Sequence, residues 1–202
     1  MALVDESSLS DLTWLGGKTV CITGVTNGIG ESLVEKICLL EAKPEKLILL
    51  ARNPRLVAEV RDRVEAAGIA CETHIGDLGR PDEVETMAKA VARTNSKLHC
   101  LINHGGIWLA DKQRVVLDNG LEAHFAVNFL SMVVLVTTLL PLLKASAPAR
   151  VVVTGSSLYM VFAKGTVQFD DLQVPLTMVP HTLRSARMLT PPPIRHSASR
   201  AR

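Results

Sequence analysis

The sequence lacks the paired cysteines of a metal site. Its four cysteines, Cys21, Cys38, Cys71 and Cys100, are far apart, and none belongs to a CxxC pair. Metal binding is therefore not expected, and scattered thiols in a chain of 202 residues are typical of a reducing compartment. An excess of charge of one sign is also lacking, because the net charge is only +2. A nucleic-acid partner is therefore not expected either.

No unbroken apolar run of membrane-spanning length is present. In the one candidate, residues 125–143, the apolar run is interrupted by Asn128, Ser131, Thr137, Thr138 and Pro141. A bilayer span needs about 20 nearly unbroken apolar residues, so we expect a helix that packs against other protein. Residues 1–15 contain no basic residue and no continuous apolar stretch, unlike a secretory signal. These absences predict a cytoplasmic protein.

Acidic residues are missing from the end of the sequence. Residues 174–202 contain five arginines and five of the ten prolines, but no Asp or Glu. The remaining 1–173 contain 17 Lys and Arg against 20 Asp and Glu. We predict a leader over 1–15, a folded domain over 16–173 and a basic, proline-rich, irregular tail over 174–202. The abrupt change after Gln173 suggests an altered reading frame or alternative splicing.

Strand and helix patterns alternate through the predicted domain. Short apolar or β-branched runs predict five buried strands at 18–23, 46–51, 68–75, 99–103 and 150–154. Amphipathic stretches between them predict helices at 31–41, 55–66, 81–91 and 118–143. This order predicts an α/β fold, a Rossmann-type doubly wound parallel sheet with helices on both faces.

The segment 23–30 (TGVTNGIG) joins the first predicted strand to the first predicted helix. Glycines here permit a tight turn and a close approach of the backbone to a ligand. The start of the following helix would offer unpaired N–H groups to a pyrophosphate. Three glycines can also form a purely structural turn, so this segment alone is weak evidence.

Further segments follow in a fixed order along the chain. They are Asp77-Leu78, Asn103-His104-Gly105-Gly106, Asn128 and VVVTGSS at 151–157. Together with TGxxxGxG, this order resembles the short-chain dehydrogenase/reductase family over residues 16–173. The segments ARN at 51–53 and FDDLQ at 169–173 are most similar to its retinol-dehydrogenase-like branch.

The resemblance implies a site for a nicotinamide dinucleotide. The expected cofactor-binding residues are Thr23, Gly24, Asn27, Gly28, Ile29, Gly30, Arg52, Asp77, Leu78, Asn103 and Gly105. Gly24, Gly28 and Gly30 would line the diphosphate, and Asp77 would bind the adenine amino group. Asn103 and Gly105 would lie near the riboses, although the family's Asn-Asn-Ala-Gly is here Asn-His-Gly-Gly. His104 and the other histidines of the predicted domain show no ligand spacing, so we expect structural or surface roles for them.

Arg52 indicates which dinucleotide is preferred. It stands at the end of the second predicted strand, where an acidic residue would accept both ribose hydroxyls of NAD. A guanidinium group is suited instead to a 2′-phosphate. Arg52 therefore favours NADP(H) over NAD(H), and the alternative is a solvated arginine at a strand end.

The catalytic part of the family pattern is incomplete. By resemblance, Ser156 would hydrogen-bond the substrate carbonyl and Asn128 would hold a water of a proton relay. The family's Tyr-x-x-x-Lys is absent: the single tyrosine, Tyr159, follows Ser156 by three residues, and Lys164 follows Tyr159 by five. Loss of a general acid typically costs about 10²–10⁴ in rate. The family's last strands are also missing, which leaves the strand at 150–154 at the sheet edge.

Three interpretations follow. The first is an NADP(H)-dependent oxidoreductase acting on an alcohol or carbonyl, impaired because the Tyr-x-x-x-Lys motif is absent. The second is a non-catalytic nucleotide-binding variant that forms a homodimer or heterodimer through 118–143, a region that the family uses for dimerisation. The third is a chain that folds poorly and has no biochemical role. The residues that would select a substrate are not present.

Overall fold

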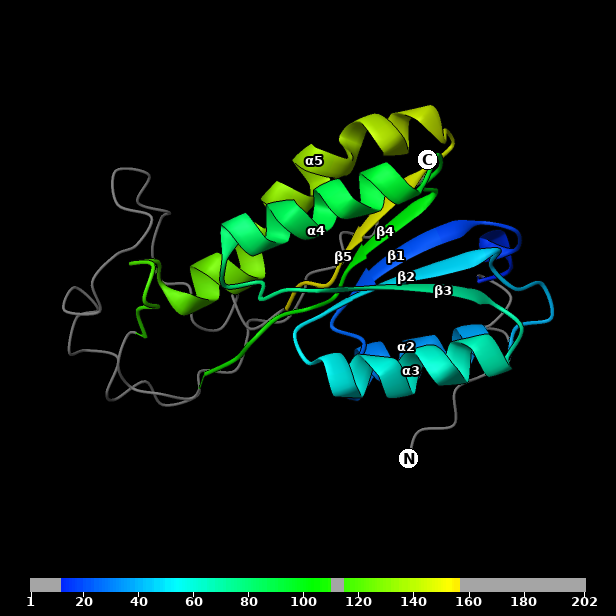
Figure 1. Ribbon diagram of the computed structural model, residues 1–202, viewed down its shortest axis with the longest axis horizontal. Helices are drawn as coiled ribbons and strands as arrows, with labels where there is room; N and C mark the ends of the chain where they lie inside the picture. Colours follow the sequence, from blue (N-terminus) through cyan, green and yellow to red (C-terminus); the bar gives the residue numbers. More distant parts are fainter. Residues whose placement is uncertain (1–11, 110–114, 157–202) are drawn as a thin grey trace, which may run out of the picture.

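The computed structural model describes residues 12–109 and 115–156. Most of the predicted leader, Tyr159, Lys164 and the predicted tail lie outside these residues. Within them, a five-stranded parallel sheet forms the centre of the molecule (Figure 1). The strands are β1 (Thr19–Thr23), β2 (Lys46–Ala51), β3 (Ala70–Ile75), β4 (Cys100–Asn103) and β5 (Arg150–Val153).

The sheet has the strand order β3-β2-β1-β4-β5, and all four neighbouring pairs are parallel. The chain therefore runs outward from β1 to β3, then returns to pair β4 with the other side of β1. The loops after β1 and β4 leave the sheet toward opposite faces. In open α/β sheets, ligands bind outside the carboxyl ends of the strands at this switch point.

Helices cover both faces of the sheet. Helices α2 (Gly28–Cys38) and α3 (Pro54–Ala66) cover one face, and α4 (Pro81–Thr94) and α5 (Ser131–Ala145) cover the other (Figure 1). A short 3-10 helix, η1 (Thr13–Leu15), precedes β1. The doubly wound architecture predicted from the alternating patterns is thus confirmed.

The two helical layers produce two cores. Val20 and Ile22 of β1 pack with residues of α2 and α3, whereas Cys21 packs with residues of α4 and α5. All five residues of β1 are buried. A strand buried on both faces has no polar side, which is why its central residues, Val20, Cys21 and Ile22, form an apolar run rather than an alternating pattern.

The long helix predicted over 118–143 is wrong at its start. Gly120 has a φ of +82°, and its N–H donates to the carbonyl of Leu117 in a turn. A left-handed residue cannot continue a right-handed helix. The helix begins at Phe125 as a π-helical stretch, η2 (Phe125–Leu130), and continues as α5.

The helix Phe125–Ala145 is also long and apolar enough to cross a membrane, and 33% of its apolar window is buried inside the protein. Leu135, Leu139 and Leu143, at helical spacing along α5, lie in the core with α4. One side of α5 therefore packs against α4 within the protein.

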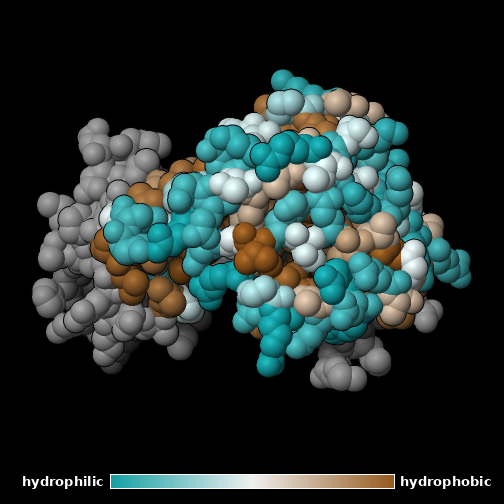
Figure 2. All heavy atoms as spheres, viewed as in Figure 1, coloured by the Kyte–Doolittle hydropathy of each residue, from teal (hydrophilic) through white to brown (hydrophobic). Residues whose placement is uncertain are grey.

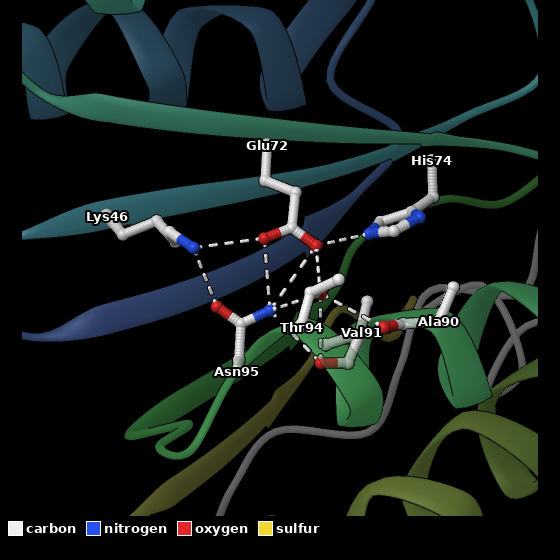
Figure 3. A network of polar contacts seen from close by, with 7 residues as sticks. All are labelled: Lys46, Glu72, His74, Ala90, Val91, Thr94 and Asn95. Carbon is white, nitrogen blue, oxygen red and sulfur yellow. Dashed lines mark hydrogen bonds and ion pairs between the residues drawn. The ribbon is translucent and has the colours of Figure 1, made fainter.

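The edge strand β3 is fixed by a polar network around Glu72 (Figure 3). One carboxylate oxygen contacts Nε2 of His74 and accepts from Oγ1 of Thr94, both at 2.6 Å. The other accepts from Nζ of Lys46 at 3.0 Å and Nδ2 of Asn95 at 3.1 Å. The network therefore connects β3 to β2 and to the carboxyl end of α4.

The opposite edge strand, β5, is much less protected. Among the described residues it pairs only with β4, and all four of its side chains are exposed. Val151, Val152 and Val153 are 44–51% exposed. Among the described strands, β5 therefore lies at the edge of the sheet.

Candidate functional site

Glycines bring the loops after β1 and β4 into backbone contact. Gly24 has a φ of +74°, and a Cβ there would lie 2.6 Å from Cα of Gly105. A Cβ on Gly30 would lie 2.1 Å from the carbonyl oxygen of Gly24. No side chain fits at either position, so these glycines are required by packing. Gly28, with a φ of +57°, has open space around its Cβ position instead.

Thr23 joins the same two loops by hydrogen bonds. Its Oγ1 accepts from the backbone N–H of His104 at 3.1 Å and of Gly105 at 2.8 Å. The hydroxyl is 81 and 82 residues away from these amides in sequence. The carboxyl ends of β1 and β4 are thereby held in a fixed relation.

The N-terminus of α2 is not capped by a side chain. Asn27 precedes the helix in an extended conformation and makes no side-chain cap hydrogen bond. At α3, by contrast, Asn53 Oδ1 accepts from the N–H groups of Arg55 and Leu56 at 3.0 and 3.1 Å. The first N–H groups of a helix need partners from outside it, and a phosphate supplies them. The open space at Gly28 and the uncapped turn fit the diphosphate of a dinucleotide.

Arg52 and Asp77 lie together at the carboxyl ends of β2 and β3. Nη1 of Arg52 is 3.6 Å from Oδ2 of Asp77, and the arginine side chain is 77% exposed. Oδ1 of Asp77 accepts from the N–H of Gly79 at 2.8 Å. The two residues that the sequence assigned to the adenosine end of the cofactor are thus brought together, and they pair with each other.

Asn103, at the end of β4, carries a buried donor without a partner. The residue is 8% exposed, and its Nδ2 has no hydrogen-bond partner among the described residues. Such atoms are rare, because an unpaired buried donor is costly. Nearby, a Cβ on Gly105 would lie 2.7 Å from Leu78. Leu78 therefore lies beside the loop that follows β4.

The two candidate catalytic residues lie on different segments. Asn128 lies on η2, where its Oδ1 accepts from the N–H of Ile107 at 2.8 Å and its Nδ2 donates to the Ile107 carbonyl at 3.0 Å. Its amide therefore holds the loop after β4. Ser156 is exposed and follows the end of β5 by three residues.

A second set of contacts holds the start of η2. Glu122 receives hydrogen bonds from Nδ1 of His124 and from the N–H of Phe125, at 2.9 and 2.7 Å. Partial burial disfavours the charged carboxylate, but these hydrogen bonds outweigh it and lower the pKa of Glu122. Figure 2 shows apolar residues gathered at this end of the molecule, where Trp108 is 69% and Phe129 48% exposed.

The sequence analysis gave His104 only a structural or surface role, and the structure places this residue between the loops of the candidate site. Its Nδ1 lies 3.0 Å from Oγ1 of Thr154, which follows β5. Its Cδ2 would lie 2.7 Å from a Cβ on Gly30, so the ring packs on the first turn of α2. The departure from the family's Asn-Asn-Ala-Gly was the signal that could have identified it.

Comparison with known proteins places this geometry in a family. A family model described as short chain dehydrogenase matches residues 18–167. Human retinol dehydrogenase 14 is 32% identical over 169 residues, which cover 77% of this chain and 48% of that protein. Mouse polyprenol dehydrogenase is 30% identical, with coverage of 77% and 46%. The chain spans about half the length of these curated relatives.

A solved structure has the same fold. The 3-oxoacyl (acyl-carrier-protein) reductase of Agrobacterium tumefaciens, solved with NADP bound, is 25% identical and superposes with a TM-score of 0.61. The match covers 79% of this chain and 60% of that one. With its matched sequence, strand order and glycine-built switch point, the chain belongs to the short-chain dehydrogenase/reductase family.

Proposed function

We propose that the chain binds NADP(H) at the carboxyl edge of its sheet, within an oxidoreductase site for an alcohol or carbonyl that is catalytically impaired. The observation that carries the proposal is the backbone contact of Gly24 and Gly105 beside the uncapped first turn of α2. That arrangement leaves room for a diphosphate and offers it N–H donors. When bound, the nicotinamide would accept or supply a hydride.

The remaining binding residues follow from their positions. The N–H groups at Gly28, Ile29 and Gly30 would donate to the diphosphate, with Thr23 and Asn27 shaping the loop. Asp77 would bind the adenine amino group beside Leu78. Asn103 has a spare donor and would contact a ribose with Gly105.

Arg52 supports NADP(H) over NAD(H). Its guanidinium is exposed and pairs only loosely with Asp77, at 3.6 Å. An exposed pair at this separation contributes little, so a 2′-phosphate can compete for the arginine. A charge-assisted, bidentate contact with phosphate is the stronger interaction.

Impairment is proposed from the residues that would move a proton. Ser156 would hydrogen-bond the substrate carbonyl. Asn128 would hold a water, but both its amide oxygen and its amide nitrogen already bond to the backbone of Ile107. Tyr159 and Lys164 do not have the family's Tyr-x-x-x-Lys spacing, and both lie outside the described residues. Without a positioned general acid, we expect turnover about 10²–10⁴ below that of an intact site.

A thermal-unfolding experiment tests cofactor binding and its selectivity. We expect NADPH to raise the melting temperature more than NADH, because a ligand that binds only the folded state stabilises it. Arg52→Ala should weaken NADPH binding about tenfold and leave NADH binding nearly unchanged. Hydride transfer to retinoid, steroid and short carbonyl substrates is measured in parallel. No thermal shift with either dinucleotide would contradict the proposal.

A non-catalytic, dimerising variant is the second candidate. It is favoured by apolar exposure along the helix Phe125–Ala145, where Phe129 is 48% and Leu140 40% exposed. Sedimentation velocity should then reveal a dimer that Leu140→Glu dissociates. A monomer at every concentration, and no capture of a full-length relative, would reject it. Cooperative melting would exclude the third interpretation, a poorly folding chain.

The predicted organisation is retained as part of the proposal. It has a leader over 1–15, the cofactor-binding domain over 16–173 and a basic tail over 174–202. We also propose a reducing compartment such as the cytoplasm, because the four cysteines are far apart in the sequence and none belongs to a CxxC pair.

A further inference from the structure

His104 bridges two elements that both border the proposed cofactor site. On one side, Nδ1 of its imidazole pairs with Oγ1 of Thr154, after β5, at 3.0 Å. On the other side, Cδ2 would lie 2.7 Å from a Cβ on Gly30, in the first turn of α2. The residue itself follows β4, and its N–H is held by Thr23. The ring is therefore positioned by three strand ends and one helix.

The second ring nitrogen, Nε2, is bonded to the carbon that packs on Gly30. Within 12–109 and 115–156, this nitrogen has no hydrogen-bond partner, and the residue is partly exposed. Nε2 is thus left at the helix turn whose N–H groups lack a side-chain cap. A nitrogen donor at this place could bind the same kind of ligand as the helix N-terminus, namely a phosphate.

We propose that His104 is an additional phosphate-binding residue of this chain, whose Nε2–H donates a hydrogen bond to the diphosphate of the bound dinucleotide. The inference rests on the proposed cofactor site. It gives a ligand-binding role to a residue for which the sequence predicts only a structural or surface role. Thr154 orients the ring through Nδ1, which leaves Nε2 for the ligand. The imidazole adds positive charge to the site when it is protonated.

The charged groups nearest the ring are paired with other residues or absent. On α2, Glu31 follows Gly30 directly, but Oε1 of its carboxylate is 2.6 Å from Nη2 of Arg63 on α3. Thr154, Thr23 and Gly24, from the ends of β5 and β1, are uncharged. No ion pair to His104 exists in the described part of the chain. Among the described residues, no charged side chain therefore competes with a phosphate for the ring.

Two substitutions separate the nitrogens of the ring. In His104→Asn, the amide reaches the position of Nδ1 and can keep the bond to Thr154, but nothing replaces Nε2. In His104→Gln, the amide reaches the position of Nε2 as a neutral donor. His99→Asn is the matched control. The oxygen of the new amide can replace Nδ1 of His99 as acceptor for the N–H of Thr19, at the amino end of β1 and away from the carboxyl ends of the strands.

The experiment measures the dissociation constant of NADP⁺ by titration calorimetry from about pH 5.5 to 8, where histidine changes its charge. We expect His104→Asn to weaken binding about tenfold at the low end of this range, and less at pH 8. His104→Gln should restore the affinity at pH 8 but not the gain on acidification. His99→Asn should match the wild type, so that the titration of the ligand itself cancels.

The outcomes distinguish this inference from the proposed function. If the wild type binds NADP⁺ and His104→Asn has the same affinity and pH profile, the role of His104 is overturned while the cofactor site stands. If both His104 variants bind equally weakly at pH 8, the ring has only a packing role. If the wild-type protein binds neither NADP⁺ nor NAD⁺, the cofactor site and the role of His104 both fail.

Discussion

At the scale of single residues, the candidate site depends on glycines, which have no Cβ atom. The missing Cβ atoms of Gly24, Gly30 and Gly105 let two loops touch through their backbones. Side chains then hold what the glycines allow: Thr23 binds the β4 loop, and Asn128 binds Ile107. Backbone packing of this kind tolerates little change, because backbone atoms cannot move aside as a flexible side chain can.

Gly30→Ala tests this requirement. Its Cβ would overlap the carbonyl oxygen of Gly24, so we expect a loss of about 1–3 kcal/mol in the free energy of unfolding. We also expect NADPH binding to be lost. Urea unfolding and calorimetry measure the two effects. Gly155→Ala is the matched control, because a Cβ there meets no atom within 4 Å. Equal stability of the two variants would contradict the packing argument.

At the scale of elements, the two edge strands of the sheet differ in how they are held. β3 is connected through Glu72 to Lys46 on β2 and to Thr94 at the end of α4. Burial disfavours the charged form of Glu72, but its hydrogen bonds outweigh burial and lower the pKa to about 2. The carboxylate is therefore a structural group that keeps its charge and stabilises the outer strand.

The pH dependence of stability follows from this shift. A carboxyl whose pKa is lowered on folding stabilises the protein above its unfolded value, near 4.5, and loses that contribution as the pH falls toward 2. We expect Glu72→Gln to cost about 2 kcal/mol at pH 7 and to flatten the loss between pH 4.5 and 2. Urea unfolding across this range measures both effects.

Glu85→Gln is the control for this prediction. Glu85 contacts Lys89 on the same helix at 2.7 Å, and its side chain is 50% exposed. Such a surface pair contributes little. Its removal should therefore change neither the free energy of unfolding at pH 7 nor its decrease between pH 4.5 and 2. If Glu72→Gln behaved like Glu85→Gln, the network would have no stabilising role.

At the scale of the whole molecule, the described sheet ends at β5, an edge strand with exposed valines. Arg150, the only charged residue of β5, has its guanidinium 4.2 Å from the centre of the Trp14 ring. Val151, Val152 and Val153 carry no charge, and β5 has no second neighbour among the described strands. An uncharged open edge is a template for pairing with another chain.

Val152→Lys should therefore lower the self-association of the protein. Val152 is 44% exposed, so the change should cost little stability while it places a charge on the open edge. Light scattering at increasing concentration measures the effect. Leu39→Lys is the control, because Leu39 is 79% exposed but lies on the C-cap of α2, away from any edge. An equal reduction by both variants would point to general apolar exposure rather than strand pairing.

The sequence predicted most of the fold because buried parallel strands and amphipathic helices have distinct local patterns. The five strands and the helices α2, α3 and α4 lie within a few residues of their predicted bounds. The prediction was wrong for 118–122, because the left-handed turn at Gly120 interrupts an otherwise helical pattern. Glycine tolerates either hand, so its presence alone did not indicate where the helix begins.

By itself, the sequence determined where the backbone can turn and approach a ligand, since that property belongs to glycines at fixed positions. The pairing of side chains was decided only by the tertiary structure. Arg52 meets Asp77, Asn128 meets Ile107 and His104 meets Thr154 across 25, 21 and 50 residues of sequence. Such partners become neighbours only when the fold brings the segments beyond the carboxyl ends of the strands together, and no local pattern encodes that distance.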